Sequence, residues 1–500
     1  MGPTLKVPLK NKGRLIFWAA SVFCAGLLLF HNLGQAPLWQ DEAETAVLAR
    51  YTLKFGVPKA FDGINLVSQN QGADYNKAYT WNYSPWLGIY TAAASFLLLG
   101  ENTFTSRLPF AIFGILSLFL IHRLARRWSG DRTAADITLW LTLLSVPFIL
   151  HARQCRYYML AVFFTYYLYW AYQDCLESKP RAGWHLNIAA LGLFYSNFLL
   201  FFAVAGGVIS HFLLFVPKKA RFLRRHAAAL ACVGLVLLPG FLFFRILSRA
   251  GGGAPNLALQ CWGNIRAYAA DIDAHLFPLI LALPLIKWLP LKELRAPLAY
   301  LAGGLLFLVL APHGFFRYLI CFLPLFSFFT SSAILKSWEI KPVLGLCFAG
   351  AILFTNIFSV SLWLGKVKLW KTALPNLAYE IAHPINEPLK ATVGYLNQNA
   401  APGDLALITY PDLPFMFYTP LRVIGGGSGD RMIRVADVKW IVLRDDSEKR
   451  FWPLDFKNFE RIPLAAPNRP WGNRPDPKSH YYRTASVPDL AAIYRRKIVK

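Results

Sequence analysis

Charged residues that could do chemistry gather at three places in a chain that is otherwise strongly apolar. The first is the acidic pair Asp41-Glu42, the second is a basic and aromatic segment that begins at His151, and the third is a short turn around Arg317. An ionisable group flanked by apolar sequence usually has a partner or a function, because burying it alone is costly. These three segments are therefore the candidate site.

The residue types indicate transfer of a group from a phosphate-linked donor. Arg153, Arg156 and Arg317 carry planar guanidinium groups that suit phosphate oxygens. Asp41 could remove a proton from a hydroxyl acceptor, while Glu42 would orient a neighbour or bind a cation. Further side chains beside these groups would line the same cavity, namely His151, Tyr157, Tyr158 and Tyr318.

Each segment also has a purely structural interpretation, which the sequence leaves open. An acidic pair after an apolar helix often only begins a solvated loop. Arginines at helix ends commonly anchor a helix at the membrane interface. A lone histidine such as His151 is more often a packing residue than a ligand. The aromatic stretch at 79–90, which includes Tyr83 and Trp86, is typical of an aromatic belt at a membrane surface.

The composition places these segments in a membrane protein. Of the 500 residues, 56% are apolar and only 16% are charged, whereas a soluble chain carries about 25% charge. Mean hydropathy is +0.38, and the apolar residues come in blocks long enough to cross a bilayer. The net charge of +25 comes mostly from short loops between those blocks, which indicates orientation in a membrane rather than nucleic acid binding.

The positive-inside rule predicts eleven spans, with the N-terminus in the cytoplasm. A basic N-terminal segment precedes an uncleaved first span at 15–30. The block at 184–216 is too long for one span, so we expect a hairpin that turns at 195–197. The short block at 86–99 is expected to lie along the outer interface, because only then do all the rich basic clusters face the cytoplasm. The C-terminus is then outside.

This topology predicts two domains. Residues 1–363 form a transmembrane catalytic domain with a long first outer loop at 35–106, and residues 364–500 form a small α/β domain outside the membrane. Within that second domain, 405–410 and 438–443 are typical of buried strands and 386–398 of a helix. Its 21 basic and 13 acidic residues give a charge of +8, which suits a surface near anionic lipid or glycan.

At these residues the chain resembles the C-type-fold glycosyltransferases that use lipid-phosphate sugars. Its nearest branches are the protein mannosyltransferases and the lipid A aminoarabinose transferases. The resemblance covers roughly residues 10–365 and is carried by four motifs. These are Asp41-Glu42 in a long first loop, Gly-Glu-Asn-Thr-Phe-Thr-Ser-Arg-Leu-Pro at 100–109, His151 to Leu160, and Arg317-Tyr318 with Leu323-Pro324.

The resemblance implies a sugar donor linked to a polyprenyl phosphate such as undecaprenyl phosphate. Asp41 matches the family's acidic base, and Arg153, Arg156 and Arg317 lie where the family places groups near the donor phosphate. Such enzymes invert the anomeric centre by direct displacement. Several need no essential metal, although a divalent cation near Asp41-Glu42 stays open.

The sequence departs from the family in the first loop. The lysine-proline motif of the aminoarabinose transferases is replaced here by Asn-Tyr-Ser-Pro-Trp at 82–86, and Lys77 nearby becomes the candidate for a phosphate-binding role. Tyr83 and Trp86 in this stretch would line the substrate cavity. The large lumenal insert of the eukaryotic mannosyltransferases is also missing, so neither branch's acceptor is carried over.

The sequence therefore predicts an inverting glycosyltransferase of the bacterial inner membrane. It would move one sugar from a polyprenyl-phosphate donor to a periplasmic acceptor, which is a glycolipid such as lipid A, a polysaccharide or a protein. The rival interpretation is a transporter or flippase of polyprenyl-linked envelope precursors, which would be expected to show inverted repeats. A transferase that uses another donor, such as a phosphoethanolamine transferase, would keep a similar set of acids and arginines.

Overall fold

The computed structural model describes residues 11–246, 256–282, 294–383, 386–425, 437–444, 449, 454–468, 471, 474–482 and 490–497. The chain divides into two compact units. Unit 1 comprises 1–30, 110–152 and 157–375, and unit 2 comprises 31–109, 153–156 and 376–500. Unit 2 thus combines most of the predicted outer loop with the C-terminal region. The predicted division at 363/364 stays a prediction.

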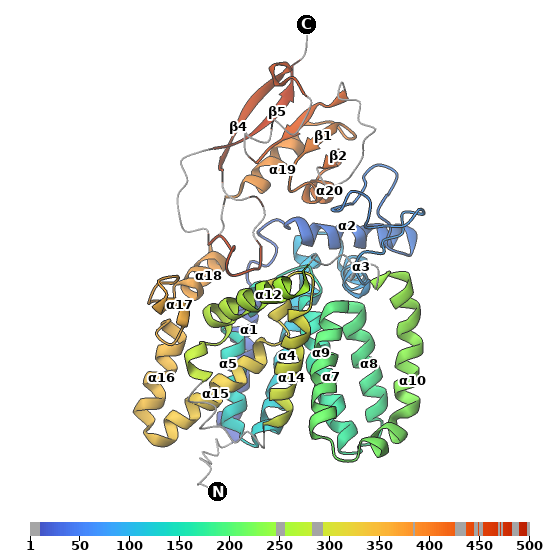
Figure 1. Ribbon diagram of the computed structural model, residues 1–500. Helices are drawn as coiled ribbons and strands as arrows, with labels where there is room; N and C mark the ends of the chain where they lie inside the picture. The colour runs from blue at the N-terminus through green and yellow to red at the C-terminus, as the bar shows by residue number, and fades with distance from the viewer. Residues whose placement is uncertain are drawn as a thin grey trace. The chain divides into compact units, whose positions relative to one another are not determined.

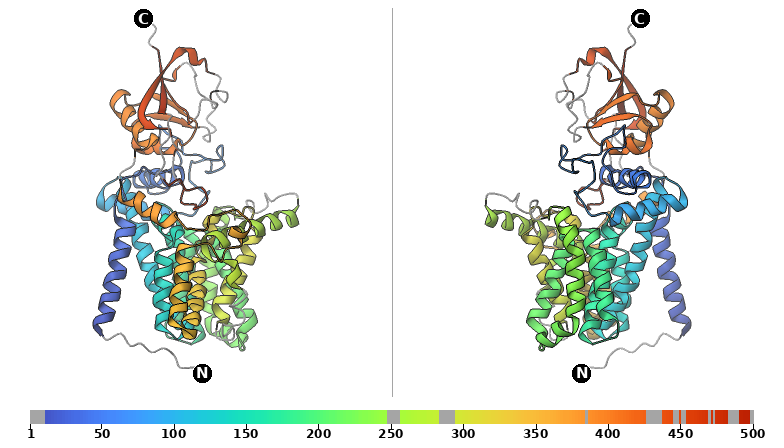
Figure 2. Two further views of the ribbon diagram at one scale, coloured as in Figure 1. Left: turned by 90° about the vertical axis from the view of Figure 1, so that its left-hand side faces the viewer. Right: turned by 90° about the vertical axis from the view of Figure 1, so that its right-hand side faces the viewer.

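Unit 1 is a bundle of apolar helices, most of which run roughly along one direction, while α12 runs across them (Figures 1 and 2). Its helices and short turns are α1 Asn11–Phe30, α4 Thr103–Ser129 (from residue 110), α5 Arg132–Leu143, α6 Val146–Ala152, α7 Tyr158–Leu176, α8 Ala182–Ser196, α9 Phe198–Phe215, α10 Lys219–Phe243, α12 Leu257–Asp271, η1 Ile272–Leu276, η2 Leu279–Leu281, α14 Arg295–Val309, η3 Phe316–Leu319, α15 Leu323–Ile340, α16 Pro342–Phe354 and α17 Val360–Trp363. Among neighbours, α7 packs on α8, α9 on α14, and α15 on both α5 and α16.

Within the described ranges, four helices are long and apolar enough to cross a membrane, namely α1, α4, α9 and α10. α5 and α6 pass the same test together but are bent by 63°. Pro147 explains the break, because proline cannot donate the hydrogen bond that would continue α5. The number of eleven spans stays a prediction, and residues 283–293 lie outside the described residues.

The hairpin predicted for 184–216 is confirmed. α8 ends at Ser196 and α9 begins at Phe198, with Asn197 between them in an extended conformation. The Asn197 side chain accepts a hydrogen bond from the Leu200 backbone N–H at 3.0 Å, which caps the first turn of α9. The polar Ser-Asn pair therefore supplies the turn that one continuous apolar helix would lack.

Small residues let α9 and α14 approach closely. A Cβ atom added at Gly207 would lie 2.5 Å from the Tyr300 carbonyl oxygen, and one added at Gly303 would lie 2.8 Å from the Gly206 carbonyl oxygen. Apolar helices in a bilayer gain little from the hydrophobic effect against each other, so close van der Waals packing of this kind holds them together.

We expect Gly207→Ala to destabilise the bundle by about 1–3 kcal/mol, because the new methyl group meets rigid backbone. The control is Gly234→Ala on α10, where nothing lies within 4 Å of the added atom. That variant should be neutral or up to about 1 kcal/mol more stable, since alanine is the better helix former. Thermal unfolding in detergent measures both, and equal midpoints would contradict the close contact.

Unit 2 contains a five-stranded mixed sheet in the order β2-β1-β3-β5-β4 (Figure 1). Its strands are β1 Leu405–Ile408, β2 Arg422–Gly425, β3 Trp440–Val442, β4 Phe459–Pro467 and β5 Leu490–Arg496. β1 pairs in parallel with β2 and β3, whereas β5 is antiparallel to β3 and β4. The predicted strands at 405–410 and 438–443 are thus confirmed as two neighbouring strands of one sheet.

The helices of unit 2 are α2 Gln40–Phe55, α3 Leu87–Leu99, α18 Ala373–Ala382 (from residue 376), α19 Pro388–Asn399 and α20 Leu413–Tyr418. α19 confirms the helix predicted at 386–398 and packs on β4 and β5. α2 packs on both α3 and α20, so the first loop and the C-terminal region share one core. The apolar block at 86–99 forms the 13-residue α3, which is too short to cross a bilayer.

Candidate active site

Glu42 forms the most deeply buried ion pair of the acidic segment. Arg107, near the start of α4, donates to both Glu42 carboxylate oxygens at 2.7 Å, from Nε and from Nη2. The Glu42 side chain is 0% exposed and that of Arg107 is 7% exposed. The Cys155 backbone N–H also donates to Glu42, at 2.7 Å. Through these hydrogen bonds, Glu42 holds three chain segments together.

We expect Glu42→Gln to destabilise unit 2 by about 3–5 kcal/mol, because it leaves the Arg107 guanidinium buried without its counter-charge. The matched control is Glu101→Gln, which removes the same charge from a pair with Arg50 whose side chains are about one-third exposed. That change should cost at most about 1 kcal/mol. Thermal unfolding distinguishes the two, and similar losses would mean that the Glu42 pair is not structural.

Asp41, in contrast, keeps an exposed edge. It lies in the first turn of α2, where the helix dipole favours negative charge. Its side chain is 15% exposed, and Arg156 Nη2 lies 3.8 Å from its Oδ2 atom. This contact is longer than a good charge-assisted hydrogen bond. Asp41 therefore lies beside a cation and keeps part of its side chain exposed.

Arg156 makes its shorter contacts to a carboxylate that the sequence interpretation missed. Its Nη1 atom donates to Glu44 Oε1 at 2.6 Å and to Thr45 Oγ1 at 2.9 Å. The Glu44 side chain is only 2% exposed. Burial raises the pKa of Glu44, while the charge of Arg156 opposes that rise. Arg156 thus joins Asp41 and Glu44, which lie one helical turn apart on α2.

The loop at 68–74 contacts the second carboxylate oxygen of Glu44. Gln69 Nε2 donates to Glu44 Oε2. The buried Asp74 carboxylate fixes this loop by accepting from the Gln69 and Asn70 backbone N–H groups, each at 2.9 Å, and from Ser68 Oγ at 2.8 Å. A chain of hydrogen bonds therefore runs from Asp74 through Gln69 to Glu44.

Arg153 has a different environment from Arg156. Its Nη1 atom donates to the His31 carbonyl oxygen at 3.0 Å. Burial lowers the pKa of Arg153 to about 10, and the nearby charge of Arg107 acts in the same direction, while Glu380 and Glu42 oppose it. The charges that act on Arg153 are therefore those of Arg107, Glu380 and Glu42.

The C-terminal region contributes an aromatic and basic wall formed by Tyr410, Arg444 and Arg474. Burial raises the pKa of Tyr410, and the charge of Asp41 raises it further. Arg474 bonds the Tyr410 side chain, and the Arg444 guanidinium lies over the Tyr410 ring at 4.8 Å from its centroid. Residues that follow β1 and β3 thus complete the surroundings of the acid.

Asp412 ties the start of α2 to the sheet. Gln40 Nε2 donates to Asp412 Oδ1 at 2.7 Å, and Gln40 Oε1 accepts from the Leu413 backbone N–H at 3.3 Å. Asp412 is buried, and burial raises its pKa to about 6. The residue before Asp41 is therefore fixed by a buried carboxyl group that is 372 positions away in the chain.

We expect Asp412 to lower the stability of the folded state as the pH rises. A carboxyl whose pKa is raised by folding binds its proton more tightly in the folded state, so ionisation destabilises that state between about pH 4 and 6. Asp412→Asn should match wild type at pH 4 and exceed it by about 3 kcal/mol above pH 6, since about two pKa units are involved. Thermal unfolding across this range measures the difference.

Asp404→Asn serves as the control for Asp412→Asn. Burial alone would raise the pKa of Asp404, but hydrogen bonds from Lys439 and Trp440 outweigh it, and the pKa is lowered. Its substitution should therefore lose stability at neutral pH, the opposite sign. A flat pH response of Asp412→Asn relative to wild type would show that Asp412 is not protonated on folding.

The other predicted residues of the first loop lie away from these contacts. Lys77 is exposed in the turn before the short bridge at Thr80. Tyr83 is 44% exposed, and the Trp86 indole N–H donates to the Trp81 carbonyl oxygen at 2.9 Å. Their assignment to the donor phosphate or to the substrate cavity stays a prediction.

In unit 1 the predicted aromatic residues cluster around His151, which is fully buried. Its ring lies 4.6 Å from that of Tyr158 and 6.1 Å from that of Phe316, between centroids. Its Nδ1–H donates to the Pro147 carbonyl oxygen at 2.7 Å. Tyr157 packs against Tyr158 at 4.7 Å. This environment agrees with the packing interpretation of His151.

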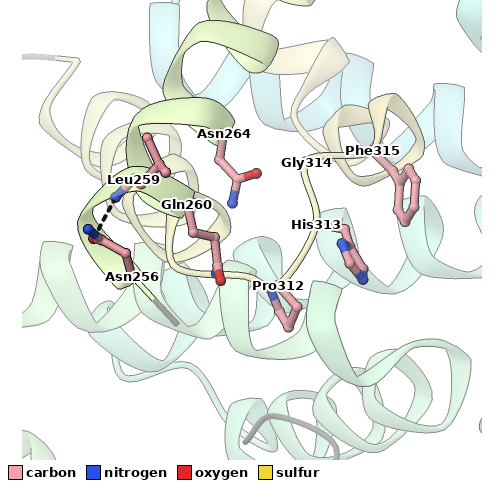
Figure 3. Close-up of a pocket in the computed structure, with 8 residues that line it drawn as sticks. All are labelled: Asn256, Leu259, Gln260, Asn264, Pro312, His313, Gly314 and Phe315. Atoms are coloured by element: carbon pink, nitrogen blue, oxygen red, sulfur yellow. Dashed lines mark hydrogen bonds between the residues drawn. The ribbon is translucent and has the colours of Figure 1, made fainter. Parts of the chain in front are cut away.

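Arg317 lies in η3, between two aromatic rings. Its guanidinium carbon is 4.6 Å from the Phe315 ring centroid and 5.6 Å from that of Tyr318, so cation–π contacts hold it in place. Phe315 also lines a pocket of about 440 Å³ between α12 and the 312–315 turn (Figure 3). On its α12 side, Gln260 and Asn264 donate to the Ala311 carbonyl oxygen, which satisfies the end of α14.

The structure therefore joins the acidic pair to Arg153 and Arg156 in unit 2, and Arg317 to the tyrosines and His151 in unit 1. That both sets face one cavity stays a prediction. Sequence reasoning missed several side chains around Asp41, namely Glu44, Gln69, Tyr410, Asp412, Arg444 and Arg474. Glu44 could have been found from the i to i+3 spacing after Asp41 if the sequence analysis had expected a helix in this part of the first loop. Nothing local marks the others.

Across the residues that the structure describes, no group of three His, Cys, Asp or Glu side chains is arranged to hold a metal ion. The use of a divalent cation stays an open prediction.

Comparison with known proteins bears on the fold. Residues 84–243 match the family model of the dolichyl-phosphate-mannose-protein mannosyltransferases. The crystal structure of ArnT from Cupriavidus metallidurans bound to undecaprenyl phosphate aligns with a TM-score of 0.61 at 14% identity, over 97% of this chain and 98% of that one. The apo ArnT structure aligns with a TM-score of 0.58. This chain has the C-type glycosyltransferase fold.

The C-type fold confirms the predicted architecture of a polytopic α-helical membrane protein with a small α/β domain. A relative from Aquifex aeolicus (strain VF5), an uncharacterised protein, is 27% identical over 220 residues. That match spans 43% of this chain and 41% of the relative's length. The family model and the fold thus agree on the glycosyltransferases of the C type, while the donor, the acceptor and the site residues are matters for proposal.

Proposed function

We propose that this protein is an inverting glycosyltransferase that moves one sugar from a polyprenyl-phosphate donor to an acceptor outside the cytoplasm. The observation that carries the proposal is the contrast between the two neighbouring acids. The Glu42 side chain is fully buried in its ion pair with Arg107, whereas the Asp41 side chain is 15% exposed. Of the pair, Asp41 is the carboxylate that a hydroxyl could reach.

Asp41 would act as the general base. It removes the acceptor hydroxyl proton while the acceptor oxygen attacks the anomeric carbon, and the bond from that carbon to the phosphate oxygen breaks. Polyprenyl phosphate leaves with the electron pair, and the proton passes later from Asp41 to water. Tyr410 with Arg444 and Arg474 would border the acceptor, because the charge of Asp41 acts on Tyr410.

Arg317 and Arg153 would stabilise the leaving phosphate. Arg317 is held by cation–π contacts, which fix its fork in one orientation. Charge grows on the phosphate as the bond breaks, so cations placed there favour the transition state over the ground state. Arg156, which the sequence interpretation gave the same role, is better assigned to Asp41 and Glu44 because both carboxylates contact it.

The proposed donor rests on the fold and on the family resemblance. The ArnT structure with the same fold is bound to undecaprenyl phosphate. The basic C-terminal region would suit an acceptor at an anionic surface in the periplasm of a bacterium. The sugar, and the choice between a glycolipid, a polysaccharide or a protein as acceptor, are left to experiment.

We expect Asp41→Asn to lower the transfer rate by about 10²–10⁴-fold, since the amide cannot take the proton. Donor binding and the unfolding midpoint should be unchanged, because the Asp41 side chain is partly exposed and Arg156 keeps its contact to Glu44. The measurement uses protein in detergent with radiolabelled polyprenyl-phosphate sugars and follows release of free polyprenyl phosphate.

Two outcomes would overturn the proposal in different ways. Undiminished transfer by Asp41→Asn would remove Asp41 as the base. Wild-type protein that binds polyprenyl-linked lipids without turnover would instead favour the flippase interpretation.

A further inference from the structure

The segment that follows the apolar helix α16 forms a compact turn that the proposed reaction does not use. Residues 355–371, which include α17, are called the α17 loop below (Figure 1). The two ends of the loop pair with each other, because the Asn356 backbone N–H donates to the Leu369 carbonyl oxygen at 2.7 Å. After α17, Gly365 takes the left-handed conformation with φ of +69°, which lets the chain turn back. The α17 loop therefore has a defined shape of its own within unit 1.

Several large apolar side chains of the α17 loop are exposed. Trp363 is 71% exposed, Trp370 is 66% exposed and Leu364 is 63% exposed. An exposed apolar patch of this kind marks a contact with a membrane or with another protein. Tryptophan is enriched where a bilayer meets water, because its ring is apolar and its N–H is polar. Since this chain has a membrane-protein fold and the loop directly follows an apolar helix, the exposed tryptophans favour the membrane surface.

All charged side chains of the α17 loop are positive. Lys366 and Lys368 are exposed, and they lie between the two tryptophans in the sequence. The third lysine, Lys371, is half-buried and donates from Nζ to the Ile352 carbonyl oxygen at 2.6 Å, near the end of α16. No acidic residue occurs between positions 355 and 371. Two exposed lysines beside exposed tryptophans therefore fit a partner that is both anionic and part of a membrane surface.

We propose that the α17 loop binds the headgroups of anionic glycerophospholipids. Lys366 and Lys368 contact the lipid phosphates, while Trp363 and Trp370 lie among the headgroups. A lysine close to an anionic bilayer surface strengthens binding roughly fivefold. A second copy of the loop would bring like charges together, so the loop suits a lipid surface better than its own copy. The inference does not rest on the proposed function, because it concerns membrane lipid rather than the sugar donor.

A buried carboxylate holds the start of the α17 loop in place. Asp273, in η1, is 4% exposed and accepts a hydrogen bond from Ser359 Oγ at 2.6 Å. It also accepts from the backbone N–H groups of Val360 at 2.9 Å and Ser361 at 2.7 Å. These bonds fix α17 before a lipid binds. Less conformational entropy is therefore lost on binding than an unstructured basic segment would lose.

The test is the affinity of the full chain for phosphatidylglycerol in neutral detergent. Thermal unfolding is followed as the lipid is titrated, because a lipid that binds the folded state raises the unfolding midpoint. Phosphatidylcholine, which carries no net charge, is the reference lipid and should bind more weakly. We expect the double variant Lys366→Gln/Lys368→Gln to bind phosphatidylglycerol about 20–30-fold more weakly than wild type, since two fivefold contributions are lost. Its affinity for phosphatidylcholine should be unchanged.

Two matched variants serve as controls. Lys366→Arg/Lys368→Arg keeps both charges and should bind phosphatidylglycerol as wild type does. Lys336→Gln/Lys341→Gln removes two lysines just before α16, where Lys336 pairs with Glu339 at 2.6 Å, and should weaken binding far less. Trp363→Ala provides a separate readout of the apolar contact, since it should weaken the binding of both lipids.

Three results would overturn the inference. Lys366→Gln/Lys368→Gln that binds phosphatidylglycerol as tightly as wild type would show that the loop is not the lipid site. An equal loss of affinity in Lys336→Gln/Lys341→Gln would show only a general attraction between a basic protein and an anionic lipid. If light scattering finds an oligomer for wild type and a monomer for Lys366→Gln/Lys368→Gln, the loop is a protein interface instead.

Discussion

The buried pair of Glu42 and Arg107 is the interaction on which the rest of the site depends. Arg107 donates its remaining N–H groups to the carbonyl oxygens of Leu33 at 2.9 Å, Ala36 at 2.8 Å and Pro37 at 3.1 Å. The link before α2, the start of α4 and the 153–156 segment therefore meet at one charge pair. Such a pair is stable only when every hydrogen bond is made, which is why the geometry around it is so fully determined.

This arrangement gives the adjacent acids Asp41 and Glu42 different roles. Because consecutive helical residues point about 100° apart, Glu42 turns into the core while Asp41 turns toward the open side of α2. Arg156 contacts Asp41 at 3.8 Å and Glu44 at 2.6 Å. Because Glu42 and Glu44 are both buried in ion pairs, we assign the proposed proton transfer to Asp41.

The C-terminal region takes part in the site rather than only covering it. Gln40 donates to Asp412, Leu38 donates its backbone N–H to the Tyr418 hydroxyl at 2.9 Å, and the charge of Asp41 raises the pKa of Tyr410. The helix that carries the acids is therefore fixed by residues more than 370 positions later in the chain. This packing gives a physical reason why the C-terminal region and the first loop belong to one compact unit.

The sequence by itself determined the features that depend on local composition. Long apolar blocks separated by basic loops must form helices in a bilayer, the Ser-Asn turn at 196–197 must break α8 from α9, and short apolar runs with turn residues between them predict the strands β1 and β3. Asp41 and the arginines also stood out, because ionisable groups are conspicuous in apolar sequence.

Only the tertiary structure decided which charges meet. Nothing local in the sequence shows that Glu42 is buried while Asp41 is partly exposed, and nothing local marks Arg107 or Asp412 as contacts of this helix, because these contacts join segments between 60 and about 370 residues apart. The energy of an ion pair is set by burial and by distance, and both are properties of the folded chain.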